Sequence, residues 1–121
     1  MAYTTTNGLK KTFTADTAVS QYRVVFLTGA DVEHGADTSG GVSIGATDRA
    51  AGAGESATIV LANGGGSAAI EASEAISAGA AVYAAADGKI GIAATLTNDV
   101  LVGYALEAAA ADGDVIEVLF A

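Results

Sequence analysis

The segment VYAAADGKIGI, residues 82–92, gives the clearest indication of fold in this 121-residue chain. Val82-Tyr83 and Ile90-Gly91-Ile92 are short runs of the β-branched and aromatic residues that strands favour. Asp87-Gly88 between them is a residue pair that tight two-residue turns prefer. The segment therefore predicts a β-hairpin.

The same alternation of turn residues and short apolar runs continues through the rest of the chain. Sixteen glycines and no proline supply the turns, and Gly, Asn and Asp cluster between the runs. We predict eight strands, at about residues 10–14, 22–28, 41–46, 56–61, 81–85, 89–93, 99–106 and 114–120. Short strands at regular spacing predict an all-β domain, either a sandwich or a small β-barrel-like fold. Residues 105–111 favour helix, so we allow at most one short helix there.

The two halves of the sequence resemble each other. Three blocks recur in the same order at offsets that grow from 57 to 59 residues: 18–26 with 75–83, 42–46 with 100–104, and 54–62 with 113–121. A duplication would place two similar β units in the fold, over residues 17–62 and 74–121. Chance similarity is the alternative, because Ala, Gly and Val dominate the composition.

Length predicts one β domain, residues 9–121, preceded by a flexible N-terminal arm, residues 1–8. Alanine supplies 29 of the apolar residues, which leaves few large side chains for a core. A monomer with so small a core has little stability to spare, and association with further copies is a common remedy. Self-assembly is therefore a physical expectation.

Charge excludes two classes of partner. Fourteen acidic residues against five Lys and Arg give a formal net charge of −9, which disfavours nucleic acid and anionic membranes. Lys10, Lys11 and Arg23 nevertheless make residues 1–23 locally basic, with Asp16 the one acid there. This segment either docks on an acidic neighbour or is an ordinary edge strand whose lysines discourage pairing.

Residues that support catalysis are scarce. The chain has one histidine and no cysteine, which excludes Cys–His chemistry and most zinc sites. His34 lies in the polar segment 31–37, which we interpret as a solvated loop rather than a cation site. The glycine-rich segments 52–57 and 64–67 lack the residues of dinucleotide and phosphate loops. We predict no catalytic residue, no cofactor and no metal site.

Several stretches resemble one known family. Residues 11–19 followed by 23–25, residues 75–83 followed by 87–90, and residues 98–110 closing on 115–119 are similar to the capsid decoration, or head cement, proteins of tailed bacteriophages. Residues 20–23 depart from the pattern, because a glycine-containing turn is expected before the second strand. The segments 31–41 and 63–69 also look longer than in simple members of the family.

The resemblance implies a structural protein, made in the host cytoplasm, that binds the outer capsid surface of the virion. It implies a homotrimer that contacts the major capsid protein and stabilises an icosahedral head by bridging capsomers, with no nucleic acid or membrane partner. The residues we expect at capsid or subunit contacts are Ala2, Tyr3, Thr4, Thr5, Thr6, Lys10, Lys11 and Arg23. A bacterial surface or adhesion module is the alternative, although no export signal is visible in the N-terminal residues. A small enzyme or ligand-binding barrel fits least well.

Overall fold

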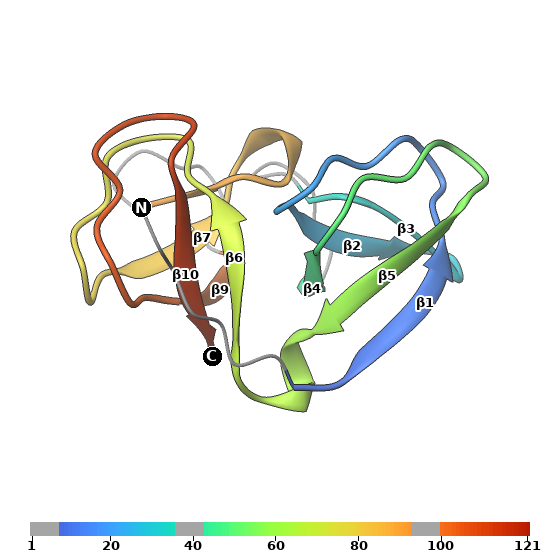
Figure 1. Ribbon diagram of the computed structural model, residues 1–121, viewed down its shortest axis with the longest axis horizontal. Helices are drawn as coiled ribbons and strands as arrows, with labels where there is room; N and C mark the ends of the chain where they lie inside the picture. Colours follow the sequence, from blue (N-terminus) through green and yellow to red (C-terminus); the bar gives the residue numbers. More distant parts are fainter. Residues whose placement is uncertain (1–7, 36–42, 93–99) are drawn as a thin grey trace.

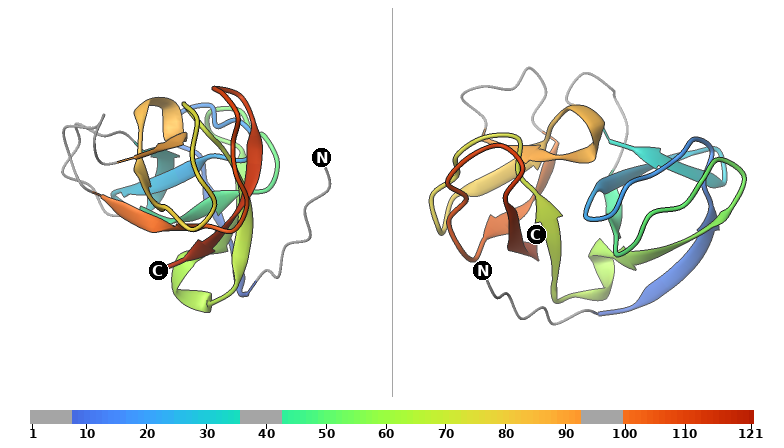
Figure 2. Two further views of the ribbon diagram at one scale, coloured as in Figure 1. Left: turned by 90° about the vertical axis from the view of Figure 1, so that its left-hand side faces the viewer. Right: turned by 45° about the horizontal axis from the view of Figure 1, so that its top comes forward.

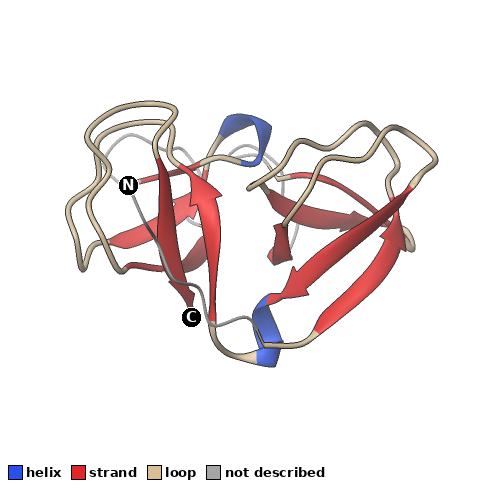
Figure 3. Ribbon diagram, viewed as in Figure 1, coloured by secondary structure: helices blue, strands red, loops and turns tan. Residues whose placement is uncertain are grey.

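The computed structural model describes residues 8–35, 43–92 and 100–121, and these residues form an all-β protein (Figures 1 and 3). Two single 3-10 turns, η1 (Ala62–Gly64) and η2 (Ala86–Gly88), are the only helical elements among them. No helix in these ranges is long and apolar enough to cross a membrane. The strands are β1 (Lys10–Thr14), β2 (Val24–Thr28), β3 (Asp31–His34), β4 (Ser43–Thr47), β5 (Ser56–Leu61), β6 (Ser67–Glu71), β7 (Ala81–Ala84), β8 (Ile90–Gly91), β9 (Leu101–Ala105) and β10 (Val115–Phe120).

The strands form two antiparallel sheets that share one topology. The first sheet has the order β1-β5-β4-β2-β3 and the second the order β6-β10-β9-β7-β8. In each sheet the first and fifth strands of the half lie side by side, and the third strand is at the far edge. The sheets lie next to each other as two lobes joined through η1, and neither closes into a barrel (Figures 1 and 2). The predicted all-β class is confirmed.

Isolated bridges also occur at equivalent places in the two sheets. Ala15 pairs with Val32 in parallel, as Ala72 does with Ile90. The antiparallel bridge between Val19 and Ala51 likewise has its counterpart between Ile76 and Ala109. These pairs stand at the same spacing along the chain as the recurring sequence blocks. The two parallel bridges connect opposite edges of a sheet, so each sheet is strongly curved.

Each sheet has an inner face that encloses a small apolar core of its own. In the first sheet this core contains Val25, Val32 and Ile59, and the equivalent residues Val82, Ile90 and Val118 are fully buried in the second. The remaining members also correspond in pairs: Phe13 with Ile70, Ala15 with Ala72, Val19 with Ile76, Ile44 with Val102, Ala51 with Ala109, Ala57 with Ile116, and Leu61 with Phe120. Ten positions in each half therefore perform the same packing role.

The eight predicted strands all exist, but two further strands were missed. We interpreted residues 31–37 as a solvated loop, and residues 63–69 looked like a long loop segment. Instead Asp31–His34 forms β3, paired with β2, and Ser67–Glu71 forms β6, paired with β10. Both segments are short. The charges of β3 hide its hairpin with the preceding β2, and the pairing of β6 is imposed by β10, far along the chain. These strands also account for much of the apparent extra loop length.

The predicted hairpin is confirmed, with a longer turn than expected. Strands β7 and β8 pair through Ala84 and Ile90, and Asp87 and Gly88 both have positive φ within η2. Residues 105–111 do not form a helix, because Ala105 ends β9 and Ala109 pairs with Ile76. Backbone pairing across the sheet outweighs the small helix propensity of alanine.

The turn before β2 explains the departure at residues 20–23. Tyr22 has a φ of 63°, and Gly79, its equivalent before β7, has a φ of 87°. The backbone N–H of each donates to a strand carbonyl, that of Thr47 or of Ala105, at 3.1 and 2.7 Å. The left-handed turn is therefore present in both halves, and only the second half uses the residue that adopts it without strain.

Candidate functional site

The predicted contact residues fall into three structural situations. Ala2, Tyr3, Thr4, Thr5 and Thr6 lie outside the described residues. Lys10 and Lys11 lie on β1, whose side chains are exposed apart from the half-buried Phe13. Arg23 lies just before β2 with a side chain that is 14% exposed. The structure thus separates Arg23 from the two lysines.

Strand β1 is an edge strand with part of its backbone unused. It pairs with β5 on one side only, and the N–H of Leu61 donates to the carbonyl of Leu9 at 2.8 Å. Because bonded and non-bonded residues alternate along an antiparallel ladder, Lys10 and Thr12 direct their backbone groups away from β5. No other strand of the described ranges pairs with that side of them. Such an edge is able to accept an added strand.

The two lysines of β1 make weak contacts only. Lys10 Nζ lies 3.2 Å from an Asp48 carboxylate oxygen, and both side chains are well exposed. Lys11 Nζ lies 5.9 Å from the centre of the Phe13 ring. Exposed contacts of these kinds contribute little stability. Both ammonium groups therefore remain available to a partner.

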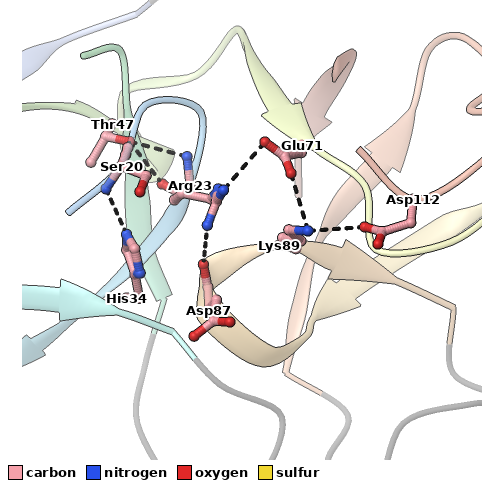
Figure 4. A network of polar contacts seen from close by, with 8 residues as sticks. All are labelled: Ser20, Arg23, His34, Thr47, Glu71, Asp87, Lys89 and Asp112. Carbon is pink, nitrogen blue, oxygen red and sulfur yellow. Dashed lines mark hydrogen bonds and ion pairs between the residues drawn. The ribbon is translucent and has the colours of Figure 1, made fainter. Parts of the chain in front are cut away.

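Arg23 takes part in a polar network between the two sheets (Figure 4). Its Nη2 lies 3.3 Å from Glu71 Oε1, and its Nη1 donates to the Asp87 carbonyl at 3.0 Å. The Glu71 carboxylate also lies 3.1 Å from Lys89 Nζ, which is 2.9 Å from Asp112 Oδ1. Hydrogen bonds to Asp112 and Glu71 raise the pKa of Lys89. The network fixes the junction between the halves.

Backbone contacts reinforce the same junction. The Glu71 N–H donates to the Tyr22 carbonyl at 2.9 Å, and the Gly88 N–H donates to the Gly35 carbonyl at 2.8 Å. A Cβ on Gly88 would lie 2.6 Å from the Val24 carbonyl oxygen. Only glycine permits this approach of η2 to β2.

His34 is used inside the first half. Its Nε2 accepts a hydrogen bond from the Ser20 N–H at 2.8 Å, which ties β3 to the loop before β2 (Figure 4). Burial and then the nearby Arg23 lower its pKa, against a smaller opposing effect of Asp87. The acceptor role requires a neutral ring, in agreement with that direction. Within the described ranges, no three His, Cys, Asp or Glu residues lie close enough to hold a metal ion.

An exposed apolar row crosses the outer face of the second sheet. Ala81 on β7, Tyr104 on β9 and Leu119 on β10 are cross-strand partners. Tyr104 and Leu119 are 43% and 41% exposed, and the neighbouring Leu101 is 42% exposed. We refer to Ala81, Tyr83, Leu101, Tyr104 and Leu119 as the outer face of the second sheet.

An apolar pocket of about 440 Å³ opens at one end of the first half. Phe13, Ile44 and Leu61, partly buried members of the first core, line it together with the exposed Leu27. The rest of its lining is Ser43, Ala62, Asn63 and Ala121. Its size suits a few apolar side chains, and it contains no cluster of titratable groups.

Sequence reasoning missed both the outer face and the pocket. The recurring blocks do contain a signal, because small or buried residues of the first half align with larger ones in the second. Ala46, for example, aligns with Tyr104, and Val60 aligns with Leu119. Aligning the two halves does not, however, show which face of the sheet each residue occupies.

Comparisons with known proteins give one family match and one similar fold. A family model described as phage cement protein matches residues 3–120. The fold is similar to a solved structure, the head fibre gp8.5 N base in bacteriophage phi29, with a TM-score of 0.69 and 18% sequence identity over 93% of each chain. No curated protein sequence matches.

Proposed function

We propose a role on the virion for this chain, which belongs to the phage cement protein family. The protein binds the outer surface of an icosahedral phage head and stabilises the head by bridging capsomers. Its partner is the major capsid protein, and the protein is a non-enzymatic homotrimer made in the host cytoplasm. Binding only the assembled shell stabilises that shell by mass action. The two similar halves would stem from an internal duplication within a single domain, residues 9–121.

The observation that carries the proposal is the free edge of β1. It combines backbone groups at Lys10 and Thr12 that no strand of the described residues pairs with and two exposed lysines, in a chain of net charge −9. A segment of the shell that extends along this edge would gain backbone hydrogen bonds, and acidic shell residues would gain Lys10 and Lys11 as partners. The arm predicted for residues 1–8 directly precedes this strand and would order on binding.

Arg23, the third cation we expected at a contact, would act indirectly. Its contacts with Glu71 and Asp87 hold the two halves in one arrangement. A rigid junction keeps the β1 edge and the second half in fixed relation, which reduces the entropy lost on docking.

The test is the occupancy of this protein on purified heads that lack it, measured by cryo-electron microscopy and by co-sedimentation. Deletion of residues 1–8 should weaken binding roughly tenfold, because about 1.4 kcal/mol, the net value of one or two hydrogen bonds, corresponds to that factor. The circular dichroism and melting temperature should stay unchanged. Undiminished occupancy after the deletion would remove the arm from the proposal.

Charge reversal supplies a matched pair of variants. Lys11→Glu should lower occupancy, whereas Arg49→Glu, also exposed but on the turn after β4, should not. Rising salt should weaken the binding of the unmodified chain as it screens the lysines. Bare heads with the unmodified protein would refute head binding itself and favour a surface module on a bacterial cell.

A further inference from the structure

The equivalent outer faces of the two sheets differ in exposure. In the first sheet, the row Val24, Ala46 and Val60 runs across β2, β4 and β5, and each side chain is at most 2% exposed. In the equivalent row of the second sheet Tyr104 and Leu119 are exposed, and Ala81 is half-buried. One face of this fold is therefore covered in one copy of the β unit and bare in the other.

The cover on the first outer face comes from the second half of the same chain. Val24, Ala46, Val60 and the neighbouring Phe26 belong to one continuous hydrophobic cluster with the core of the second half. The cross-sheet contacts of Arg23 and Glu71, described above, flank this cluster. The chain thus shows what packs on such a face, namely another β unit of its own kind.

The part of the second half that receives this face corresponds to the pocket in the first half. The pocket-lining residues Phe13, Leu27, Ile44 and Leu61 have as their equivalents Ile70, Ala84, Val102 and Phe120. These four are 0%, 0%, 3% and 8% exposed, and they lie in the same cluster as Val24 and Phe26. One end of the inner core is therefore closed in the second half, whereas it opens as an apolar pocket in the first.

We infer that the outer face of the second sheet docks on the pocket end of the first half of a second copy of this chain. The contact would repeat between chains the packing that joins the two halves within a chain. Tyr104 and Leu119 would be its apolar anchors, and Leu27 with the pocket would receive them. The inference gives the surfaces for the self-association in the proposed function and rests on that part of it, independently of head binding.

Such a contact is heterologous, because it joins two different surfaces. Each chain has one surface of each kind, so every copy is able to bind one neighbour on either side, and the assembly either closes into a ring or grows. Three copies in a ring would place six β units around one axis. Apolar surface provides the attraction, while the charge of −9 on each copy opposes it. Moderate salt should therefore strengthen this contact, although salt weakens docking on the shell.

The two surfaces can be damaged separately. Leu119→Glu places a charge on the outer face, and Leu27→Glu places one at the mouth of the pocket; both side chains are more than 40% exposed, so each variant should fold. Sedimentation equilibrium should give an oligomer for the unmodified chain and a mass near 11.7 kDa for each variant. Ala75→Glu, which adds the same charge on an exposed loop, is the matched control and should remain oligomeric.

Mixing the two variants supplies the decisive test. Each retains the surface that the other has lost, so an equimolar mixture should form a one-to-one dimer and nothing larger. Two monomers that stay apart on mixing, or variants that remain oligomeric while their circular dichroism is unchanged, would overturn the inference. If heads bind the unmodified chain but not the dissociated variants, binding of the protein to heads requires its self-association. Bare heads with an intact oligomer would refute the proposed function and leave this inference standing.

Discussion

Among the described glycines, Gly45 and Gly103 leave the least room for a side chain, and they provide the sharpest test of the packing. A Cβ on Gly103 would lie 2.0 Å from the Leu119 carbonyl oxygen, 2.9 Å from the Leu119 carbonyl carbon and 3.0 Å from Phe120 Cα. All three atoms are backbone, so no side chain can rotate away, and β9 and β10 must separate. Extra carbon in a packed site costs about 1–3 kcal/mol. We expect Gly103→Ala to lie at the upper end, about 3 kcal/mol.

Gly45 provides a second test position in the same protein, and Gly29 provides a control. Gly45→Ala should cost about as much as Gly103→Ala, because its Cβ would lie 2.0 Å from the Val60 carbonyl oxygen. Gly29 has a φ of 65° and nothing within 4 Å of an added Cβ, so Gly29→Ala should cost only the left-handed backbone strain, about 1 kcal/mol. Urea unfolding followed by circular dichroism, at one protein concentration, measures all three. If Gly103→Ala were no more destabilising than Gly29→Ala, the argument from close backbone approach would be refuted.

Two further predictions concern the polar groups of the structure. Because the folded pKa of His34 lies below the unfolded value of 6.5, the unfolded chain binds more protons between these pKa values. Stability should then fall as pH drops through 6.5 toward the folded pKa, and His34→Gln should flatten that slope in urea titrations at pH 5 to 8. Glu71→Gln removes the carboxylate between Arg23 and Lys89, whose side chains are 14% and 23% exposed, and should cost about 1–2 kcal/mol. The exposed Asp16→Asn should cost almost nothing, and equal losses in these two variants would contradict the role of the network.

Local sequence patterns were enough to predict most strands, because their residues are both β-prone and bounded by turn residues. Strands β1 and β5 have the predicted bounds, and the remaining predictions differ at their ends. The missed strand β6 pairs with β10, which lies far along the chain, whereas β3 pairs with β2 directly before it, across Gly29 and Ala30. The β6–β10 pairing has no counterpart in a local window of sequence, and β3 was missed because its polar residues, Asp31, Glu33 and His34, are poor strand formers.

The candidate site was less accessible from sequence than the fold. Lys10 and Lys11 were predicted from local charge, and both are exposed on an edge strand. Arg23 belongs to the same basic segment, but its main contacts are with Glu71 and Asp87, far along the chain. The outer face of the second sheet is defined by the contrast between two equivalent faces. That contrast appears only when the exposure of equivalent residues in the two folded sheets is compared.

The pairing of the first and fifth strands in each half has a consequence for synthesis. Strand β1 finds its partner in β5, so the first sheet cannot complete until residue 61 has left the ribosome. From then until β6 to β10 emerge, Val24, Phe26, Ala46 and Val60 have no cover. The nascent chain must therefore pass through a stage in which this apolar sheet face is open to neighbouring chains. The short η1 connection does not shorten that stage, because β6 pairs with β10 and the covering half cannot complete until residue 120 has emerged.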